Sequence, residues 1–433
     1  MPIPQRRTMS TSSAAAAASS SAPSRATNTV VLDLGGYTAK IGLASDAEPR
    51  VLPNCIYKAK SEKKRQFISN QISECKDQHQ LFHMYPFNNG FLTNWELEER
   101  VLDYFFGSEV LNIDTTQTKL LITEPYFNFQ TLKRYFAEAI FEDYGFEAAF
   151  ICPPAHLAAF QFRRDNPQEP TCLVVDSGHS FTHIVPVIDG RISWDSVIRV
   201  PVGGKILTNH LKQRITFQQL NVMDETHVIN HLKELTCFVS TDLTRDFQRA
   251  RDAFDQPETG AARTFVLPDY NAIFEGFLKP VEQTFDRPGE HEQSIRLTAD
   301  RFVVPEILFR PSAVGDTRMG VGEAAVEAIR RAPEDKRLYL FRNMVLTGGN
   351  CRLPGFRERF MQEVAPEVPE FGEAELMPVK DPIAAAWFGG KSMVESGVYD
   401  KLCVTKAEYM EHGENVCERK FVRSCPKRRS NGN

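Results

Sequence analysis

The sequence has 433 residues, of which 42% are hydrophobic and 25% charged, and its formal net charge is −5 at pH 7. This length predicts two or three domains and excludes a single small module, and the composition is typical of a folded chain. The balanced charge excludes a global electrostatic footprint for nucleic acid. No run of 18 apolar residues is present, so we expect a soluble intracellular protein with no membrane partner. Nine cysteines without a close C-x-x-C pair favour reduced thiols over a disulfide framework or a zinc site.

The chain begins with a Ser/Ala-rich segment, residues 1–28, that lacks acidic residues and predicts a disordered tail. The apolar run 29–32 then predicts a buried strand that ends in a tight turn. Residues 57–83 are polar with weak periodicity and predict a peripheral lobe. A helix is expected over 96–106 and a strand over 120–123. Strands and helices alternate, which indicates an α/β fold.

The segment from Asp165 to Pro170 contains two prolines and predicts a joint before a strand over 172–176. A second domain is expected to start there. At the other end, residues 422–433 are locally basic, and two interpretations stay open: a solvated tail, or nuclear targeting or contact with an anionic partner.

An internal repeat is the most informative feature of the sequence. Asp33 and Asp176 each follow an apolar strand, and each is followed by a glycine two residues later. A basic residue or histidine stands seven residues after each aspartate, as Lys40 and His183, and an isoleucine follows each of them. This pattern predicts two related half-molecules.

Such a turn suits phosphate binding, because small residues allow successive backbone N–H groups to point into one concavity. A carboxylate at each strand end would repel phosphate directly, but Mg²⁺ and its water ligands placed between them would satisfy both. Lys40 could then neutralise a phosphate oxygen. A purely structural Asp-Gly turn is the alternative for either hairpin alone, and the matched pair favours a nucleotide site.

A third glycine turn, Gly348-Gly349-Asn350, follows another apolar strand and could let a base or ribose approach the backbone. Gly320-Val-Gly322 resembles a dinucleotide motif but lacks a preceding strand, so a helix start is predicted there. The sequence contains no G-x-x-x-x-G-K-[ST] motif, which excludes a Walker-type NTPase.

Several segments resemble the fold family of actin, the actin-related proteins, Hsp70 chaperones and sugar kinases. The resemblance runs from Thr29 to Phe421 and rests on these segments: Asp33–Gly42, Val175–Pro186, Leu346–Phe356, Asn94-Trp95, Leu121–Pro125, Asp381–Gly390 and Thr405–Tyr409. Other segments resemble a nuclear branch of the actin-related proteins that belongs to SWR-type (SRCAP-type) chromatin remodellers: Thr123–Phe129, Val202–Leu211, Val222–Val228 and Arg301–Phe309.

This resemblance implies an actin-like α/β fold in which two related α/β domains, divided into four subdomains, enclose a nucleotide cleft. The expected boundaries are 29–165 for the first domain and 166–384 for the second, with a helical lobe at 208–300, an insertion at 271–293 and a return to the first domain at 385–421. The implied cofactor is ATP or ADP with Mg²⁺. The implied role is a nuclear, non-catalytic scaffold in a remodeller that exchanges the Z-type variant histone. The expected partners are the remodeller's ATPase and HIT-type zinc-finger subunits, with a secondary contact to nucleosomal DNA.

The resemblance also implies the site. Asp33 and Asp176 would face Mg²⁺ through water, Lys40 would contact phosphate, and Lys233 with Glu234 would border adenine. The remaining expected nucleotide contacts are Gly35, Gly36, Ser177, Gly178, His179, Ser180, Gly348, Gly349 and Asn350.

The chain departs from the family pattern at several positions. Pro154 stands where the family has its hydrolytic glutamine, and proline offers no side-chain amide to orient a water. His179 and Ser180 replace an aspartate and a glycine, and Arg352-Leu353 replaces an aromatic near the base. Little or no hydrolysis is therefore expected. The lobe at 57–83 does not resemble the loop that joins actin subunits, so no filament is expected. An active ATPase, a sugar-kinase-like phosphotransferase and a filament subunit remain as alternatives.

Overall fold

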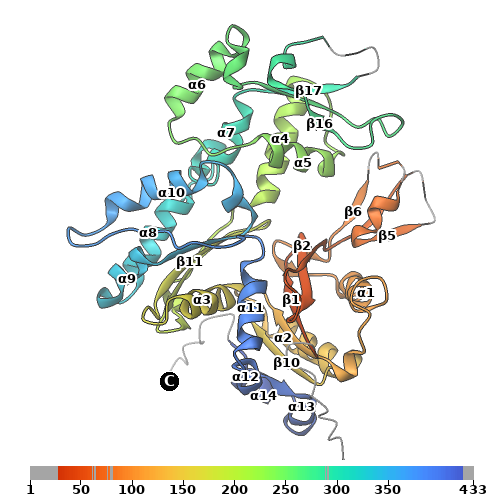
Figure 1. Ribbon diagram of the computed structural model, residues 1–433, viewed down its shortest axis with the longest axis vertical. Helices are drawn as coiled ribbons and strands as arrows, with labels where there is room; N and C mark the ends of the chain where they lie inside the picture. Colours follow the sequence, from red (N-terminus) through yellow and green to blue (C-terminus); the bar gives the residue numbers. More distant parts are fainter. Residues whose placement is uncertain are drawn as a thin grey trace, which may run out of the picture.

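The computed structural model describes residues 28–60, 62, 65–75, 77–78, 81–287, 289 and 292–422 (Figure 1). The tails predicted at 1–28 and 422–433 lie outside these residues, apart from Asn28 and Val422. In the described residues two larger sheets, two three-stranded sheets and one two-stranded ribbon carry the fold (Figure 1).

The first large sheet has six strands in the order β19-β10-β9-β1-β2-β3. Its strands are β1 (Thr29–Leu34), β2 (Thr38–Leu43), β3 (Arg50–Pro53), β9 (Lys119–Thr123), β10 (Ala148–Cys152) and β19 (Val404–Thr405). Its helices are α1 (Trp95–Phe106), α2 (Gln130–Glu138), α12 (Tyr399–Leu402), α13 (Lys406–His412) and α14 (Glu414–Lys420). Val30 and Leu32 enter one core cluster and Val31 another, so β1 is buried on both faces. This explains its continuous apolar run.

The second large sheet has the order β13-β12-β11-β18, and β14 also pairs with β12. Its strands are β11 (Cys172–Ser177), β12 (Thr182–Ile188), β13 (Arg191–Ile192), β14 (Ile198–Val200) and β18 (Met344–Thr347). The associated helices are α8 (Val321–Arg331), α9 (Arg337–Arg342) and α10 (Phe356–Val364). The helix start predicted at Gly320 is confirmed, because Gly320 is the N-cap residue of α8.

The repeated hairpin has the same register in both sheets. β1 and β2 are antiparallel with Asp33 opposite Lys40, and β11 and β12 are antiparallel with Asp176 opposite His183. Each hairpin also has a parallel neighbour, β9 beside β1 and β18 beside β11. The repeat predicted from sequence is therefore a repeat of structure.

Two smaller sheets lie at the edges of the molecule. One contains β4 (Ile56–Lys58), β5 (Gln66–Ile68) and β6 (Phe82–Met84), and a two-stranded ribbon of β7 (Phe87–Asn88) and β8 (Phe91–Leu92) follows it. The other contains β15 (Arg263–Val266), β16 (Phe277–Leu278) and β17 (Ser294–Leu297). It accompanies α4 (Gly204–Gln218), α5 (Thr226–Thr236), α6 (Leu243–Arg251) and α7 (Asp300–Glu306). The segment 271–293 is built into this sheet, since β16 pairs with β15.

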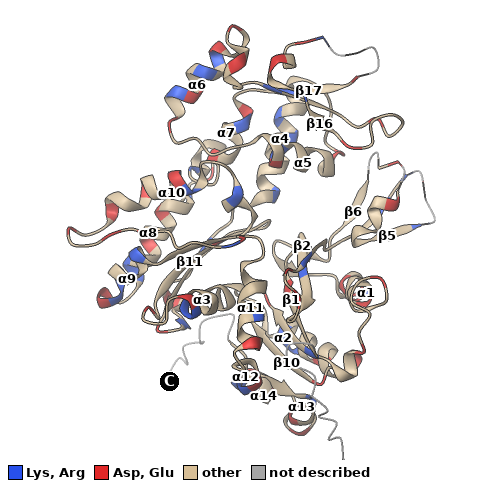
Figure 2. Ribbon diagram, in the orientation of Figure 1, with Lys and Arg blue, Asp and Glu red and all other residues tan. Residues whose placement is uncertain are grey.

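Basic and acidic residues are mixed over the outer helices. Figure 2 shows both signs along α6, which contains Arg245, Asp246, Arg249 and Arg251. Both colours are spread over the molecule in Figure 2, in keeping with the balanced composition.

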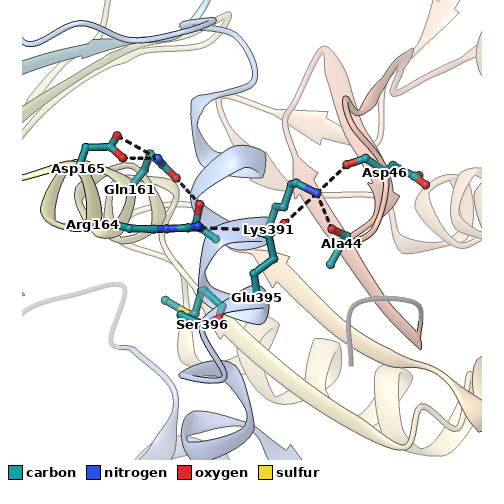
Figure 3. Close-up of polar contacts among 10 residues, drawn as sticks. Ala44, Asp46, Gln161, Arg164, Asp165, Lys391, Glu395 and Ser396 are labelled. Carbon is teal, nitrogen blue, oxygen red and sulfur yellow. Dashed lines mark hydrogen bonds and ion pairs between the residues drawn. The ribbon is translucent and has the colours of Figure 1, made fainter. Parts of the chain in front are cut away.

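Two helices join the halves of the molecule. α3 (Pro154–Asp165) and α11 (Ala385–Glu395) pack closely against each other. Leu157 of α3 enters a core cluster of the first sheet, while Ala158 enters one that contains β11. Figure 3 shows α11 between α3 and the β2–β3 turn: Lys391 Nζ donates to the carbonyls of Ala44 at 2.7 Å and Asp46 at 2.8 Å.

The opposite side of α11 reaches α3. Arg164 Nη1 lies 3.1 Å from Glu395 Oε2, and Ser392 donates to Gln161 (Figure 3 shows the Arg164 and Gln161 contacts). Trp387 Nε1 also donates to the Val31 carbonyl at 3.1 Å, inside the first sheet. α11 therefore couples the first sheet to α3.

Candidate functional site

The two hairpins face a cavity of about 660 Å³. Thirteen of the fourteen sequence-predicted site residues line it: Asp33, Gly35, Gly36, Lys40, Asp176, Gly178, His179, Ser180, Lys233, Glu234, Gly348, Gly349 and Asn350. Ser177 is fully buried beside the cavity, where it hydrogen-bonds with Thr182 at 2.8 Å and accepts from Asn350 Nδ2 at 3.1 Å. The structure thus gathers residues from four distant parts of the chain, and the role of each in nucleotide binding stays a prediction.

The first hairpin presents one cation and one carboxylate. Lys40 Nζ lies 3.6 Å from Asp33 Oδ2, while Thr123 donates to Asp33 Oδ1 at 2.9 Å. The Leu34 amide donates in turn to Thr123 Oγ1 at 2.9 Å, so β9 fixes the end of β1. A Cβ at Gly35 would lie 2.6 Å from the Thr38 carbonyl oxygen, so the turn is too tight for a side chain there.

The Asp176 carboxylate is held by a phenol. Tyr126 donates to Asp176 Oδ2 at 3.1 Å, and its hydroxyl oxygen accepts from the Ala155 amide at 2.9 Å in the first turn of α3. Burial raises the pKa of Asp176 to about 6, and the negative charge of Asp33 adds to that rise. A divalent cation between the two carboxylates would favour the ionised form of Asp176.

The second hairpin and the third glycine turn are joined by Asn350. Its Nδ2 donates to the Gly178 carbonyl at 2.8 Å as well as to Ser177. Gly348 has φ +89°, and a Cβ there would lie 2.2 Å from the Ser177 carbonyl oxygen, so only glycine fits. A Cβ at Gly349 would have no heavy atom within 4 Å. The backbone is therefore open to the cavity at Gly349, as a base or ribose would require.

Lys233 and Glu234 differ in their exposure. Lys233 is buried, and its ammonium donates to Asn230 Oδ1 at 2.8 Å and to Thr208 Oγ1 at 3.0 Å. Burial lowers the pKa of Lys233, and the nearby charge of Glu234 opposes that shift. Glu234 is exposed and accepts from Asn230 Nδ2 at 2.7 Å. Of these two side chains, that of Glu234 is the more accessible from the cavity.

Sequence reasoning missed an aromatic contact that crosses the cavity. Tyr37, at the tip of the first hairpin, stacks on His179 at the tip of the second. Asn230 Nδ2 also donates to the Tyr37 hydroxyl at 3.1 Å. Burial lowers the pKa of His179 to about 3, and the charges of Lys233 and Lys205 lower it further, so the ring is neutral at pH 7. The sequence does show an aromatic residue, Tyr37, directly after Gly36 in the first hairpin. No pattern within one hairpin indicates that this ring stacks on a ring of the other.

The stack also bounds a second cavity of about 620 Å³. Tyr37, His179 and Asn230 line both cavities, and the second one extends toward Lys58 and His83 of the small sheet. The two aromatic rings therefore separate an inner space beside the carboxylates from an outer space between the small sheet of β4 and β6 and the helices α4 and α5.

The residues that depart from the family pattern also lie at the site. Pro154 is the first residue of α3 and lines the inner cavity, as do Arg352 and Leu353. Because its side chain has no donor or acceptor, Pro154 cannot orient a water molecule.

A nucleotide with Mg²⁺ fits these residues on three grounds. The cavity volume lies in the range of small-ligand sites, the backbone is open at Gly349, and the carboxylates of Asp33 and Asp176 line the space together with the Lys40 ammonium group. In the described part of the chain no group of three His, Cys, Asp or Glu side chains could hold a metal ion by protein ligands alone. A metal ion here would consequently complete its coordination with water and phosphate oxygens.

Comparison with known proteins now decides the family. The family model described as Actin matches residues 24–422. The chain belongs to the actin family. Actin-related protein 6 of Drosophila melanogaster is 37% identical over 396 residues, which cover 90% of this chain and 98% of that protein. Actin-related protein 6 of Arabidopsis thaliana is 34% identical over 425 residues, covering 91% and 99% respectively.

A fungal relative has a similar level of identity. Actin-like protein ARP6 of Cryptococcus neoformans is 34% identical over 414 residues, which cover 90% of this chain and 84% of that protein. The predicted family and the predicted actin-like α/β fold are thus confirmed. Across the described residues, every helix is too short or too polar to cross a membrane.

Proposed function

We propose that this actin-family protein is a nuclear scaffold subunit of an SWR-type chromatin remodeller, which exchanges the Z-type variant histone into nucleosomes. It holds ATP or ADP with Mg²⁺ and hydrolyses the nucleotide little or not at all. Similarity to proteins named actin-related protein 6 over about nine tenths of the chain supports the assignment to this branch of the family.

Pro154 is the observation that carries the non-catalytic part of the proposal. It lines the cavity at the start of α3, where the family resemblance expects a glutamine that orients water. The described cavity offers Tyr126 near this position, but its hydroxyl is already engaged with Asp176 and the Ala155 amide. A poorly oriented water lowers the rate of phosphoryl transfer, which depends chiefly on positioning and electrostatics.

The retained hairpins carry the binding part of the proposal. Lys40 and the backbone amides of the two hairpins would hold the phosphates, and Asp33 and Asp176 would face Mg²⁺ through water. Glu234 and the Gly348–Asn350 turn would border the nucleoside. Bound Mg²⁺ supplies charge neutralisation for the phosphates.

Partner binding is assigned to surfaces away from the cavity. The segment 271–293 exposes two phenylalanine side chains, Phe274 at 59% and Phe277 at 48%. Exposed aromatic side chains on a structured segment are typical of protein interfaces. We assign this segment to the remodeller's ATPase or HIT-type zinc-finger subunit, and the basic tails to a secondary, salt-sensitive contact with nucleosomal DNA.

The test is affinity purification of the tagged full-length protein from nuclear extract, followed by mass spectrometry of proteins and of bound nucleotide. We expect the remodeller's ATPase and zinc-finger subunits, together with ATP or ADP. Because β16 pairs with β15, deleting 271–293 would damage the sheet, so the sharper variant is Phe274→Ser with Phe277→Ser. Phe371→Ser is the matched control, since Phe371 is 95% exposed and lies outside that segment.

The same preparation separates the alternatives. An active ATPase or sugar-kinase-like enzyme would release phosphate at a rate comparable with filament-forming actin. A filament subunit would sediment as a polymer. A monomer recovered without nuclear partners would contradict the scaffold role.

A further inference from the structure

A carboxyl group lies buried in α1 without a charged partner. The hydrophobic face of α1 packs Val101, Leu102 and Phe105 into the core, and Glu98 lies on that face with 0% of its surface exposed. In the described part of the chain neither carboxyl oxygen of Glu98 takes part in a hydrogen bond of normal geometry. Burial of an ionised carboxylate without a partner is strongly unfavourable, so this group needs another explanation.

The side chain that interacts with Glu98 is that of Asn54, which follows β3 and is also 0% exposed. Its Nδ2 donates to the Gly35 carbonyl at 3.0 Å, and its backbone amide donates to the Tyr37 carbonyl at 2.8 Å. Asn54 therefore holds the tip of the first hairpin at two points, one on each side of Gly36. Its remaining oxygen, Oδ1, is buried without a donor among the described residues.

A single proton on Glu98 would satisfy two of these three unpaired oxygen atoms. A neutral Glu98 carries an O–H donor that can bond to Asn54 Oδ1, whereas an ionised Glu98 would place two acceptors against each other. Burial raises the pKa of Glu98 to about 8 and outweighs the opposing effect of an N–H bond from the Asn54 amide to the ionised carboxylate. That N–H bond does not form with normal geometry, and Asn54 Nδ2 is already engaged with the Gly35 carbonyl. Glu98 is accordingly neutral at pH 7 in the folded protein.

We propose that Glu98 is a positioning residue, which as a neutral acid donates to Asn54 and thereby fixes the Gly35–Tyr37 tip of the first hairpin. Its effect on a nucleotide rests on the function proposed above, but the link to the hairpin does not. Sequence reasoning gave no sign of this link, because Glu98 and Asn54 lie in separate elements and neither belongs to the Asp-x-Gly pattern.

Other titratable groups near this link keep their charge state between pH 6.5 and 8.5. Burial raises the pKa of Cys55, beside Asn54, to about 12, and it raises the pKa of Tyr37 and Tyr144 well above the ordinary tyrosine value. Burial lowers the pKa of His83, on β6, to about 4. The charged groups around α1 are Glu99 and Asp103, near the Tyr144 hydroxyl, Arg100, which binds Gln66 of β5, and Arg50 of β3. Asp176, whose pKa burial raises to about 6, titrates alike in wild type and in a Glu98 variant, so a difference between the two in this range belongs to Glu98.

The direction of the pH effect follows from linkage. The folded pKa of about 8 lies above the ordinary glutamate value of 4.5, so the stability that neutral Glu98 contributes is complete below pH 4.5 and is lost as the pH rises toward 8. Glu98→Gln removes this titration but keeps an N–H donor for Asn54. The ratio of the wild-type unfolding constant to that of Glu98→Gln should therefore rise about tenfold per pH unit between pH 5.5 and 7.5 and level off above pH 8.

The experiment measures urea unfolding of the full-length protein from pH 5.5 to 8.5, with amide hydrogen exchange at Asn54 as a local readout. Glu98→Gln should keep the Asn54 amide protected, while Glu98→Leu should lose that protection even where its global stability equals or exceeds wild type. Glu96→Gln, an exposed change in the same helix, controls for the loss of one carboxylate.

Equal pH slopes for wild type and Glu98→Gln, or full protection of Asn54 in Glu98→Leu, would overturn the proposal. The rate of release of a fluorescent ATP analogue, measured in parallel, should increase from pH 6.5 to 8.5 in wild type more than in Glu98→Gln. If no variant binds the analogue, the proposed nucleotide function fails, while unfolding and exchange still test the role of Glu98.

Discussion

Tyr37 and His179, one from each hairpin, stack with ring centroids 4.6 Å apart and an interplanar angle of 15°. The contact joins the two halves of the molecule at the hairpin tips and closes the inner cavity on one side. A stacked pair contributes about 0.5–1.5 kcal/mol beyond the burial of its area. The stack therefore holds the two hairpin tips together through contacts of the protein alone.

Replacing Tyr37 tests this closure. Tyr37→Ala removes the ring and should speed nucleotide release, because the inner and outer cavities then merge. Tyr37→Phe keeps the stack and loses only the hydrogen bond from Asn230, so it should release nucleotide at close to the wild-type rate. Stopped-flow release of a fluorescent nucleotide distinguishes the two. Equal rates for Tyr37→Ala and wild type would show that the stack is no barrier.

The two aspartates should matter for retention of the ligand. Asp33→Ala and Asp176→Ala should both lose nucleotide and Mg²⁺-dependent thermal stabilisation, since a ligand at a hundredfold excess over Kd stabilises the native state by about 2.7 kcal/mol. The measurement is the shift in melting temperature on adding ATP and Mg²⁺. Asp46→Ala serves as a control, because Asp46 caps the β2–β3 turn away from the cavity. Variants that keep the full shift would show that the cleft is wrongly assigned.

Pro154→Gln should restore little hydrolysis. Proline at the start of α3 also fixes the backbone, and Pro153 precedes it as the N-cap residue. An amide side chain on this helix start therefore gains a donor without the geometry that positions water. Phosphate release under single-turnover conditions is the appropriate assay, and a rate approaching that of filament-forming actin in the variant would contradict this reasoning.

Acid should destabilise the fold through buried histidines. Burial lowers the pKa of His83 and His156 to about 4 and that of His179 and His183 to about 3, against an ordinary value of 6.5. Their contribution to stability is present above pH 6.5 and is lost as the pH falls, because the unfolded chain then binds protons that the folded chain does not.

Glu98 and Asp176 act in the opposite direction, since their folded pKa values are raised to about 8 and about 6. The net expectation is that unfolding takes up about two protons near pH 5. Urea unfolding between pH 4.5 and 6.5 gives this number of protons from the slope of the unfolding free energy against pH. His156→Gln should reduce it by about one proton, and an unchanged slope would show that His156 does not titrate as expected.

The contacts of α11 should differ in their energetic weight. Lys391→Met keeps the aliphatic stem but leaves the partly buried Ala44 and Asp46 carbonyls without their charged donor, and should cost about 1.5–3 kcal/mol. Arg164→Met breaks a more exposed ion pair with Glu395 and should cost at most about 1 kcal/mol. Urea unfolding measures the loss of stability in both variants. A larger loss for Arg164→Met than for Lys391→Met would contradict this ranking of the two contacts.

The sequence was sufficient to predict the hairpins, the alternation of strands and helices and the residues around the cavity. The Asp-x-Gly pattern is local, and its 143-residue repeat between Asp33 and Asp176 fixes which segments are equivalent. The Gly348-Gly349 turn was also identifiable, because small residues after an apolar strand signal close approach of the backbone.

Contacts between distant elements were not predictable in this way. Tyr37 stacks on a ring 142 residues away, and Glu98 meets Asn54 only because α1 packs beside the segment that follows β3. An amphipathic pattern predicts α1 correctly, yet it cannot show why a glutamate occupies its buried face. Such pairs depend on tertiary packing, and the local periodicity of a single sequence does not show which distant residues come into contact.

The shared register of the hairpins has a consequence for direction. Two equivalent hairpins would make a symmetric cradle, in which a chain of phosphates could lie either way round. Lys40 and His183 occupy equivalent places, but burial lowers the pKa of His183 to about 3, so at pH 7 Lys40 alone of the two is a cation. The two hairpins therefore differ in charge, and of these two equivalent positions only Lys40 offers a positive charge to an anionic ligand.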